Sequence, residues 1–186
     1  AGFIVPRADA HQGEYVADAD ARLAWLTGFT GSAGFAIVTT DQAGVFIDGR
    51  YRVQVRSQID AAHFTPVPWP ETRPSDWLRE ALPKGGRVGF DPWLHTRKEI
   101  EGMEGALEGS NIGLIAVDAN PVDAIWPDRP DAPVGRTRIH PAEWAGETAQ
   151  DKRARLAAEL KAEGQAAALL SLPDSISWLL NIRGSD

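Results

Sequence analysis

The residues of this chain that are best suited to binding chemistry form an Asp-Gly-Arg-Tyr run at positions 48–51. An apolar run precedes them, so Arg50 lies directly after a predicted strand end, where ligand crevices tend to form in α/β units. Its planar and permanently charged guanidinium group suits a carboxylate or a peptide carbonyl. Spacing alone favours a simpler interpretation, in which Arg50 is a surface residue paired with Asp48. Arg50 is therefore a candidate substrate-binding residue with two open interpretations.

A second candidate is the loop at residues 9–14, where Asp9, His11 and Glu14 could in principle bind a metal ion. The four histidines of the chain are far apart in the sequence, and no second carboxylate cluster with ligand spacing lies nearby. We therefore favour a loop in which these side chains hydrogen-bond to backbone amides.

The glycines at positions 28, 31 and 34 resemble a nucleotide-binding loop only superficially. They follow a predicted helix and precede a predicted strand, which is the reverse of the order in dinucleotide-binding folds. The spacing instead predicts a tight turn that contains positive-φ positions.

Other features exclude several classes of function. The sequence has no phosphate-binding loop, no Gly-x-Ser-x-Gly turn and no His-Glu-x-x-His helix. Its lack of cysteine excludes disulfides, thiol nucleophiles and cysteine-bound zinc. A net charge of −7 without a basic run argues against nucleic acid as a partner. No apolar stretch approaches the roughly 18 residues of a membrane span, and a cytoplasmic location fits.

The elements that must position these residues alternate between strands and helices. The predicted strands are residues 2–5, 34–40, 44–48, 64–69, 87–90 and 112–117. The predicted helices run from a cap at Asp18 or Asp20 to Gly28, from Ser75 or Asp76 to Leu82, from Thr96 to about Leu107, and from Asp151 to Glu163. This alternation predicts an α/β fold, a mixed sheet flanked by helices.

Three details of this pattern need a choice between alternatives. Residues 51–59 fit a strand or a helix, and we favour a helix because polar residues at 56–58 break the alternation. Prolines place residues 64–69 at a sheet edge. Residues 127–141 hold four prolines and little periodicity, which indicates a linker.

Six of the seven tryptophans divide into two groups by their surroundings. Trp25 and Trp178 lie on apolar helix faces and are predicted core residues. The residues at 69, 93, 126 and 144 lie beside prolines or in irregular segments, which suits surface packing or an interface.

An internal repeat defines the domain organisation. The segment from Trp25 to Ser32 returns from Trp178 to Ser185 with its Trp, Leu, Gly and Ser in register, at a distance of a whole domain. We therefore expect an N-terminal α/β domain over residues 1–146, followed over residues 147–186 by the incomplete beginning of a similar domain. The chain is then expected to be part of a longer protein.

Several motifs, in order and at compatible spacings over the full length, resemble the N-terminal part of aminopeptidase P. This is the Xaa-Pro aminopeptidase of the creatinase/prolidase superfamily, in its three-domain form. The motifs are Asp9-Ala10-His11-Gln12, Glu14-Tyr15, Gly28-Phe29-x-Gly31-Ser32-Ala33-Gly34, Asp48-Gly49-Arg50-Tyr51, Ile125-Trp126-x-Asp128-Arg129-Pro130 and Asn181-x-Arg183-Gly184-Ser185-Asp186.

The resemblance implies removal of an N-terminal residue ahead of proline by a centre of two divalent metal ions, usually manganese. It implies that the metal ligands belong to a third, catalytic domain, so that no metal or catalytic residue can be mapped onto this chain. It also implies a substrate-binding role for Arg50, a peptide substrate with proline at its second position, and a homodimer. The alternatives are another superfamily enzyme, such as a creatine-type amidinohydrolase or a dipeptidase, and a standalone binding module.

Overall fold

The structure is a computed structural model that describes residues 1–184. Ser185 and Asp186, which close the last of the motifs above, lie outside the described residues. The chain divides into two compact units. The first unit comprises residues 1–10 and 14–131, and the second unit comprises residues 11–13 and 132–186.

The first unit is built on a six-stranded mixed sheet with the strand order β4-β3-β2-β1-β5-β6. The strands are β1 (Gly2–Pro6), β2 (Gly34–Thr39), β3 (Ala43–Ile47), β4 (Thr65–Pro68), β5 (Gly86–Phe90) and β6 (Ile112–Ala116). β2 pairs antiparallel with β1 and with β3, and the other neighbouring pairs are parallel. Five strands therefore end at the same edge of the sheet.

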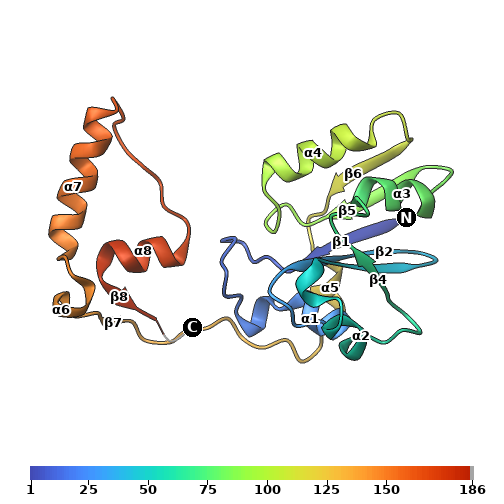
Figure 1. The fold of residues 1–186 in the computed structure, drawn as a ribbon, viewed down its shortest axis with the longest axis horizontal. Coiled ribbons are helices and arrows are strands. Elements are labelled where there is room, and N and C mark those ends of the chain that lie inside the picture. Colours follow the sequence, from blue (N-terminus) through green and yellow to red (C-terminus); the bar gives the residue numbers. More distant parts are fainter. Residues whose placement is uncertain (185–186) are drawn as a thin grey trace. The chain divides into compact units, whose positions relative to one another are not determined.

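Helices cover both faces of this sheet (Figure 1). One face packs against α3 (Pro74–Ala81) and α4 (Arg97–Leu107). The other packs against α1 (Arg22–Thr27), α2 (Gln54–Gln58) and α5 (Pro121–Ile125). Successive strand residues point to opposite faces, so Ile4 belongs to the first layer and Val5 to the second. The predicted α/β class, a mixed sheet flanked by helices, is confirmed.

Local sequence signals explain several element boundaries. The turn at residues 40–42 joins β2 and β3, both predicted as strands, into an antiparallel hairpin. Thr96, the predicted start of the helix, caps α4 through a reciprocal pair of hydrogen bonds with Glu99. β4, with prolines at 66 and 68, lies at the sheet edge. Residues 49–58 form a 3-10 turn, η2 (Gly49–Tyr51), followed by α2, which confirms the helical interpretation.

Two predicted helix caps are wrong. Asp18 and Asp20 lie in a short 3-10 helix, η1 (Asp18–Asp20), and α1 begins after Ala21 without a side-chain cap. α3 begins at Pro74, ahead of the predicted Ser75 or Asp76. Proline starts this helix because its φ is already helical and its missing N–H would have no intrahelical partner there.

The tryptophan predictions are also partly wrong. Trp25 and Trp178, predicted in the core, are 36% and 45% exposed, whereas Trp126, predicted to pack at the surface or in an interface, is 8% exposed. The rings of Trp25 and Trp126 stack with centroids 5.1 Å apart. Trp25 therefore covers the other ring, a long-range contact that helical spacing alone cannot reveal.

The second unit is smaller and contains α6 (Ala142–Ala145), α7 (Ala149–Ala162), α8 (Pro173–Leu180) and a two-stranded sheet of β7 (Arg138–Ile139) with β8 (Ile182–Arg183). β7 lies within the segment predicted as a linker, so that prediction is wrong at residues 138–139. Lys152 is buried and donates hydrogen bonds to the Trp178 carbonyl oxygen at 2.9 Å and to Asn181 Oδ1 at 2.8 Å. This contact joins α7 to the end of α8.

The sequence repeat has the same local structure in both units. Gly28 ends α1 in a left-handed conformation with φ of 80°, and Asn181 ends α8 in a left-handed conformation with φ of 50°. Glycine and asparagine are the residues that adopt this conformation at least cost. The positive-φ turn predicted at Gly28 is confirmed.

A buried arginine connects α1 to α5 within the first unit. The Arg22 side chain is 7% exposed and donates from Nε to Asp123 Oδ1 at 2.6 Å and from Nη2 to Asp123 Oδ2 at 3.0 Å. Arg129 contacts the same carboxylate at 2.8 Å. Both arginines also contact Asp20, at 2.9 and 3.4 Å, so two cations share two carboxylates.

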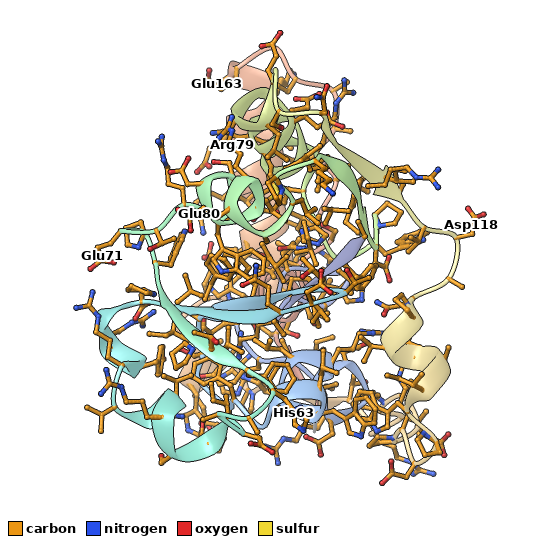
Figure 2. The ribbon with its side chains drawn as sticks, turned by 90° about the vertical axis from the view of Figure 1, so that its right-hand side faces the viewer. His63, Glu71, Arg79, Glu80, Asp118 and Glu163 are labelled. Atoms are coloured by element: carbon orange, nitrogen blue, oxygen red, sulfur yellow. The ribbon has the colours of Figure 1, made fainter. Side chains whose placement is uncertain are left out.

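We expect Asp123→Ala to lower the free energy of unfolding of the chain by about 1–3 kcal/mol, because Arg22 loses most of its hydrogen-bond acceptors in a buried position. Urea unfolding measures this change. Asp118→Ala is the matched control, since Asp118 is exposed and points away from the fold (Figure 2); its effect should stay within about 0.5 kcal/mol. Equal effects of the two variants would contradict the role given to Asp123.

Hydrogen exchange should be faster in the second unit than in strands β1–β3. Among the described residues, the buried apolar side chains belong to the first unit, whereas the buried side chains of the second unit are Lys152 and Asn181. Low apolar burial gives a low free energy of local opening. Mass spectrometry on the dilute, monomeric chain tests this, and equal protection of α7 and β2 would disprove it.

Candidate functional site

The candidate site lies where parallel strands end. Asp48 follows β3, Trp69 follows β4 and Asp91 follows β5, so these residues share the carboxyl edge of the sheet. This edge is where open α/β sheets bind ligands. The predicted residue Arg50 lies there, in η2.

Asp48 organises the turn that carries Arg50. Its Oδ1 atom accepts a hydrogen bond from the Arg50 backbone N–H at 2.9 Å, which caps η2. The same carboxylate accepts bonds from the Arg50 side chain, from Nε at 3.1 and 3.2 Å and from Nη2 at 2.7 Å. One carboxylate thus holds both the backbone and the side chain of Arg50.

The guanidinium group is held but accessible. The Arg50 side chain is 65% exposed, against 20% for Asp48. The hydrogen bonds from the Arg50 side chain and backbone hold the pKa of the Asp48 carboxyl below its ordinary value, and the same side-chain bond raises the pKa of Arg50. Both groups are therefore charged at neutral pH. The ion pair that formed the simpler interpretation of the sequence is present, and it leaves the guanidinium facing solvent.

Tyr51 supports the turn from the side of the core. Its ring centroid lies 5.2 Å from Arg50 Cζ. The ring also packs edge-on against the Phe29 ring, with the two centroids 5.5 Å apart. Its hydroxyl group and the Ser32 hydroxyl group form a hydrogen bond of 2.6 Å, which lowers the pKa of Tyr51. The aromatic ring therefore fixes η2 against the loop that follows α1.

Gly31 is required for this contact. A Cβ atom at this position would lie 2.2 Å from Phe29 Cζ and 2.9 Å from Tyr51 Cδ1. Any side chain there would displace one of the two rings. Gly31 thus allows the loop after α1 to lie close to the Tyr51 ring. The prediction of a tight turn did not include this contact.

The contact between Ser32 and Tyr51 is a feature that sequence reasoning missed. Both residues belong to the motifs quoted above, but nineteen positions separate them. The pairing of β2 with β3 places Gly34 beside Ile47, and this register brings the two loops together. Strand register is the signal that could have indicated the contact.

A second ion pair lies beyond the site. Arg52 contacts Glu71, which projects from the turn after β4 (Figure 2). Both side chains are about half exposed. This pair resembles the Asp48–Arg50 pair in composition, so it provides matched variants for experiments.

The structure does not bring the other sequence candidates together as a metal site. Asp9 is buried, whereas His11 and Glu14 are exposed. Within residues 1–184, no group of three or more histidine, aspartate or glutamate side chains could hold a metal ion. No helix in that range is long and apolar enough to cross a membrane.

The arrangement at Arg50 offers hydrogen-bond donors to a ligand. It offers guanidinium N–H groups on a rigid turn, which can donate to an oxygen of a ligand. The nearby hydroxyls of Ser32 and Tyr51 bond to each other. The site is therefore suited to recognition.

Comparison with known proteins identifies the family. A model of the creatinase/prolidase N-terminal domain matches residues 4–123, most of the chain. The chain belongs to the creatinase/prolidase N-terminal domain family. A second model with the same description matches residues 128–186. Two related N-terminal domain segments in one chain agree with the sequence repeat.

Curated proteins of similar sequence match nearly the whole chain. A protein of Talaromyces marneffei named "Probable Xaa-Pro aminopeptidase P" is 41% identical over 187 residues, and the match covers 99% of this chain. Aminopeptidase P2 of Arabidopsis thaliana is 38% identical over 188 residues. The chain spans 28% and 26% of the lengths of these relatives, and so corresponds to an N-terminal part of them.

A solved structure has the same fold. The X-prolyl aminopeptidase of Caenorhabditis elegans, described as a cytosolic enzyme with a di-nuclear active site, superposes with a TM-score of 0.89 at 34% identity. The match covers 100% of this chain and 31% of that protein. The fold of the family therefore extends over both units.

His95 lies at the same edge, in the connection between β5 and α4. Its ring packs edge-on against Phe90 at 5.8 Å, and its buried Nε2 atom has no hydrogen-bond partner among the described residues. Burial lowers the pKa of His95, while the charges of Glu99 and Asp91 oppose this shift. The neutral ring is therefore the form that the folded chain favours.

The free energy of unfolding should fall as the pH drops below about 6.5, because the unfolded chain protonates His95 at its ordinary pKa of 6.5 while the folded chain resists protonation. The loss should continue until the pH reaches the lower pKa of the folded state. His95→Gln should reduce this slope in urea unfolding between pH 7 and 5. His63→Gln changes an exposed histidine and is the control (Figure 2). An unchanged slope in His95→Gln would disprove the assignment.

Proposed function

We propose that this chain is the non-catalytic N-terminal portion of a metal-dependent Xaa-Pro aminopeptidase, an enzyme that removes the N-terminal residue ahead of a proline. The observation that carries the proposal is the likeness over the whole chain to an X-prolyl aminopeptidase, at a TM-score of 0.89. In the longer protein, this portion would shape the substrate cleft and contribute to subunit contacts.

Within this proposal, Arg50 binds the peptide substrate. Its side chain is exposed, anchored by Asp48 and stacked beside Tyr51, so little conformational freedom would be lost on binding. A guanidinium group donates well to carbonyl and carboxylate oxygens, which are the groups that a peptide offers. The position at the carboxyl edge of the sheet supports this role.

The cofactor of the proposed enzyme is a pair of divalent metal ions, which we propose to be manganese. The described residues do not provide a fitting ligand set, so residues outside this chain would hold both ions. We further propose a homodimer and a cytoplasmic location. The cytosolic description of the Caenorhabditis elegans enzyme supports the location.

The domain organisation is part of the same proposal. Residues 1–146 would form the N-terminal domain, and residues 147–186 would begin a second, related domain that is incomplete here. The catalytic domain would follow. Two compact units and two matched family segments support a two-part organisation of this chain.

In the longer protein, Arg50→Ala should lower kcat/KM for an Xaa-Pro peptide by about ten- to a hundredfold, because a charged hydrogen-bond donor to the substrate is lost. Steady-state kinetics measure this change, and metal content and melting temperature should stay nearly the same. Arg50→Lys should recover only part of the activity, since a point charge cannot reproduce the two-pronged geometry.

Arg52→Ala is the matched control, because it removes an exposed, paired arginine from the same edge of the sheet. It should leave kcat/KM within about twofold. If Arg50→Ala lowers the melting temperature but leaves kcat/KM within about twofold of the parent enzyme, Arg50 is a scaffold residue and its proposed role is wrong.

A further inference from the structure

The Asp48–Arg50 pair presents hydrogen-bond donors without a net positive charge. The Asp48 carboxylate lies against Nε and Nη2 of Arg50 at 2.7–3.2 Å, and both groups stay ionised at neutral pH. The positive charge of the guanidinium is thereby balanced within the site. The pair also lies at an exposed edge of a chain whose net charge is −7.

A charge-balanced pair discriminates between the oxygens that a peptide can offer. A C-terminal carboxylate approaching Arg50 would be attracted by the guanidinium and repelled by Asp48, so the two electrostatic effects largely cancel. An uncharged peptide carbonyl avoids this repulsion and still accepts a hydrogen bond from an exposed N–H. The pair therefore favours a carbonyl oxygen relative to an arginine without a partner.

We propose that Asp48 is a specificity-determining residue, which makes the Arg50 site select a backbone carbonyl of a peptide rather than its free C-terminal carboxylate. This inference rests on the proposed function, in which Arg50 contacts the substrate. It defines the preferred ligand as the internal part of a peptide chain, so that a charge at the end of the peptide contributes nothing to binding at Arg50.

The position of Asp48 allows its charge to be removed while the backbone turn stays capped. Oδ1 accepts the Arg50 backbone N–H, and asparagine keeps an oxygen at that position. Packing of the Arg50 guanidinium beside the Tyr51 ring is independent of the carboxylate charge. Asp48→Asn therefore removes the negative charge and the acceptor at Oδ2, while the cap on the turn and the bond from Arg50 Nε to Oδ1 can be kept. Asp48→Ser, which also caps helical turns, serves if Asp48→Asn folds poorly.

The experiment compares two substrates with the longer protein that contains this chain, at about 0.15 M salt. The substrates are an Xaa-Pro-Yaa tripeptide with a free carboxylate and the same tripeptide with a C-terminal amide. The measured quantity is the ratio of their kcat/KM values. For the parent enzyme we expect no advantage of the free acid. For Asp48→Asn we expect the ratio to move toward the free acid by about three- to tenfold, the scale of one unscreened contact between charges in water.

Glu71→Gln is the matched control. It removes one negative charge from the same edge of the sheet, but from the partner of Arg52 rather than of Arg50. The ratio should then stay within about twofold of the parent value, because solvent and salt screen charges that are not in contact. An equal shift in Glu71→Gln would mean that the general charge of the surface, and not Asp48, sets the preference, which would overturn the inference.

The remaining outcomes separate this inference from the proposed function. If Arg50→Ala lowers kcat/KM for both substrates while Asp48→Asn leaves their ratio unchanged, Arg50 binds peptide but Asp48 does not set the specificity. If the parent enzyme prefers the free acid severalfold, Arg50 recognises the carboxylate and the inference is wrong. If Arg50→Ala changes neither substrate, the proposed binding role of Arg50 fails, and the inference fails with it.

Discussion

Burial of the central strand β1 on both faces is the constraint from which the rest of the first unit follows. Ile4 packs into one helical layer and Val5 into the other, so neither face of the sheet can be left to solvent. Connections that return to the sheet in parallel must cross over one face, and here helices form those crossovers. Five strands consequently end at one edge. The connections at that edge carry the residues available for recognition.

The candidate site lies at this edge of the sheet and is built on a short turn. η2 begins at the residue that follows Asp48, and the carboxylate holds the turn and the arginine together. Tyr51 then ties the turn to the loop after α1 through Ser32, a contact that tolerates no side chain at Gly31. The guanidinium is thus presented on a support that packing and hydrogen bonds fix from two sides. Such a support is typical of a recognition element.

The two units share one local feature, a helix that ends at a left-handed residue, but they differ in the structure that surrounds it. A helix ends at a left-handed residue in each, Gly28 in the first unit and Asn181 in the second. In the first unit, this helix end leads to β2 of a six-stranded sheet, which buried apolar side chains stabilise. In the second unit, the described strands have two residues each, and a buried lysine bonded to the end of α8 holds the helices together. The family models match both segments, which agrees with a repeated domain type.

The sequence by itself determined the elements whose signals are local. Apolar runs defined β2 and β3, proline placed β4 at an edge, Thr96 defined the start of α4, and the motif at residues 48–51 identified Arg50 as a candidate. The family also followed from motifs read in order. Only the tertiary structure decided which tryptophan is buried, that Tyr51 bonds to Ser32, and that Arg22 and Arg129 share Asp123. The physical reason is range: periodicity and capping depend on neighbours within a few residues, whereas burial and side-chain pairing depend on strand register and helix packing between distant segments.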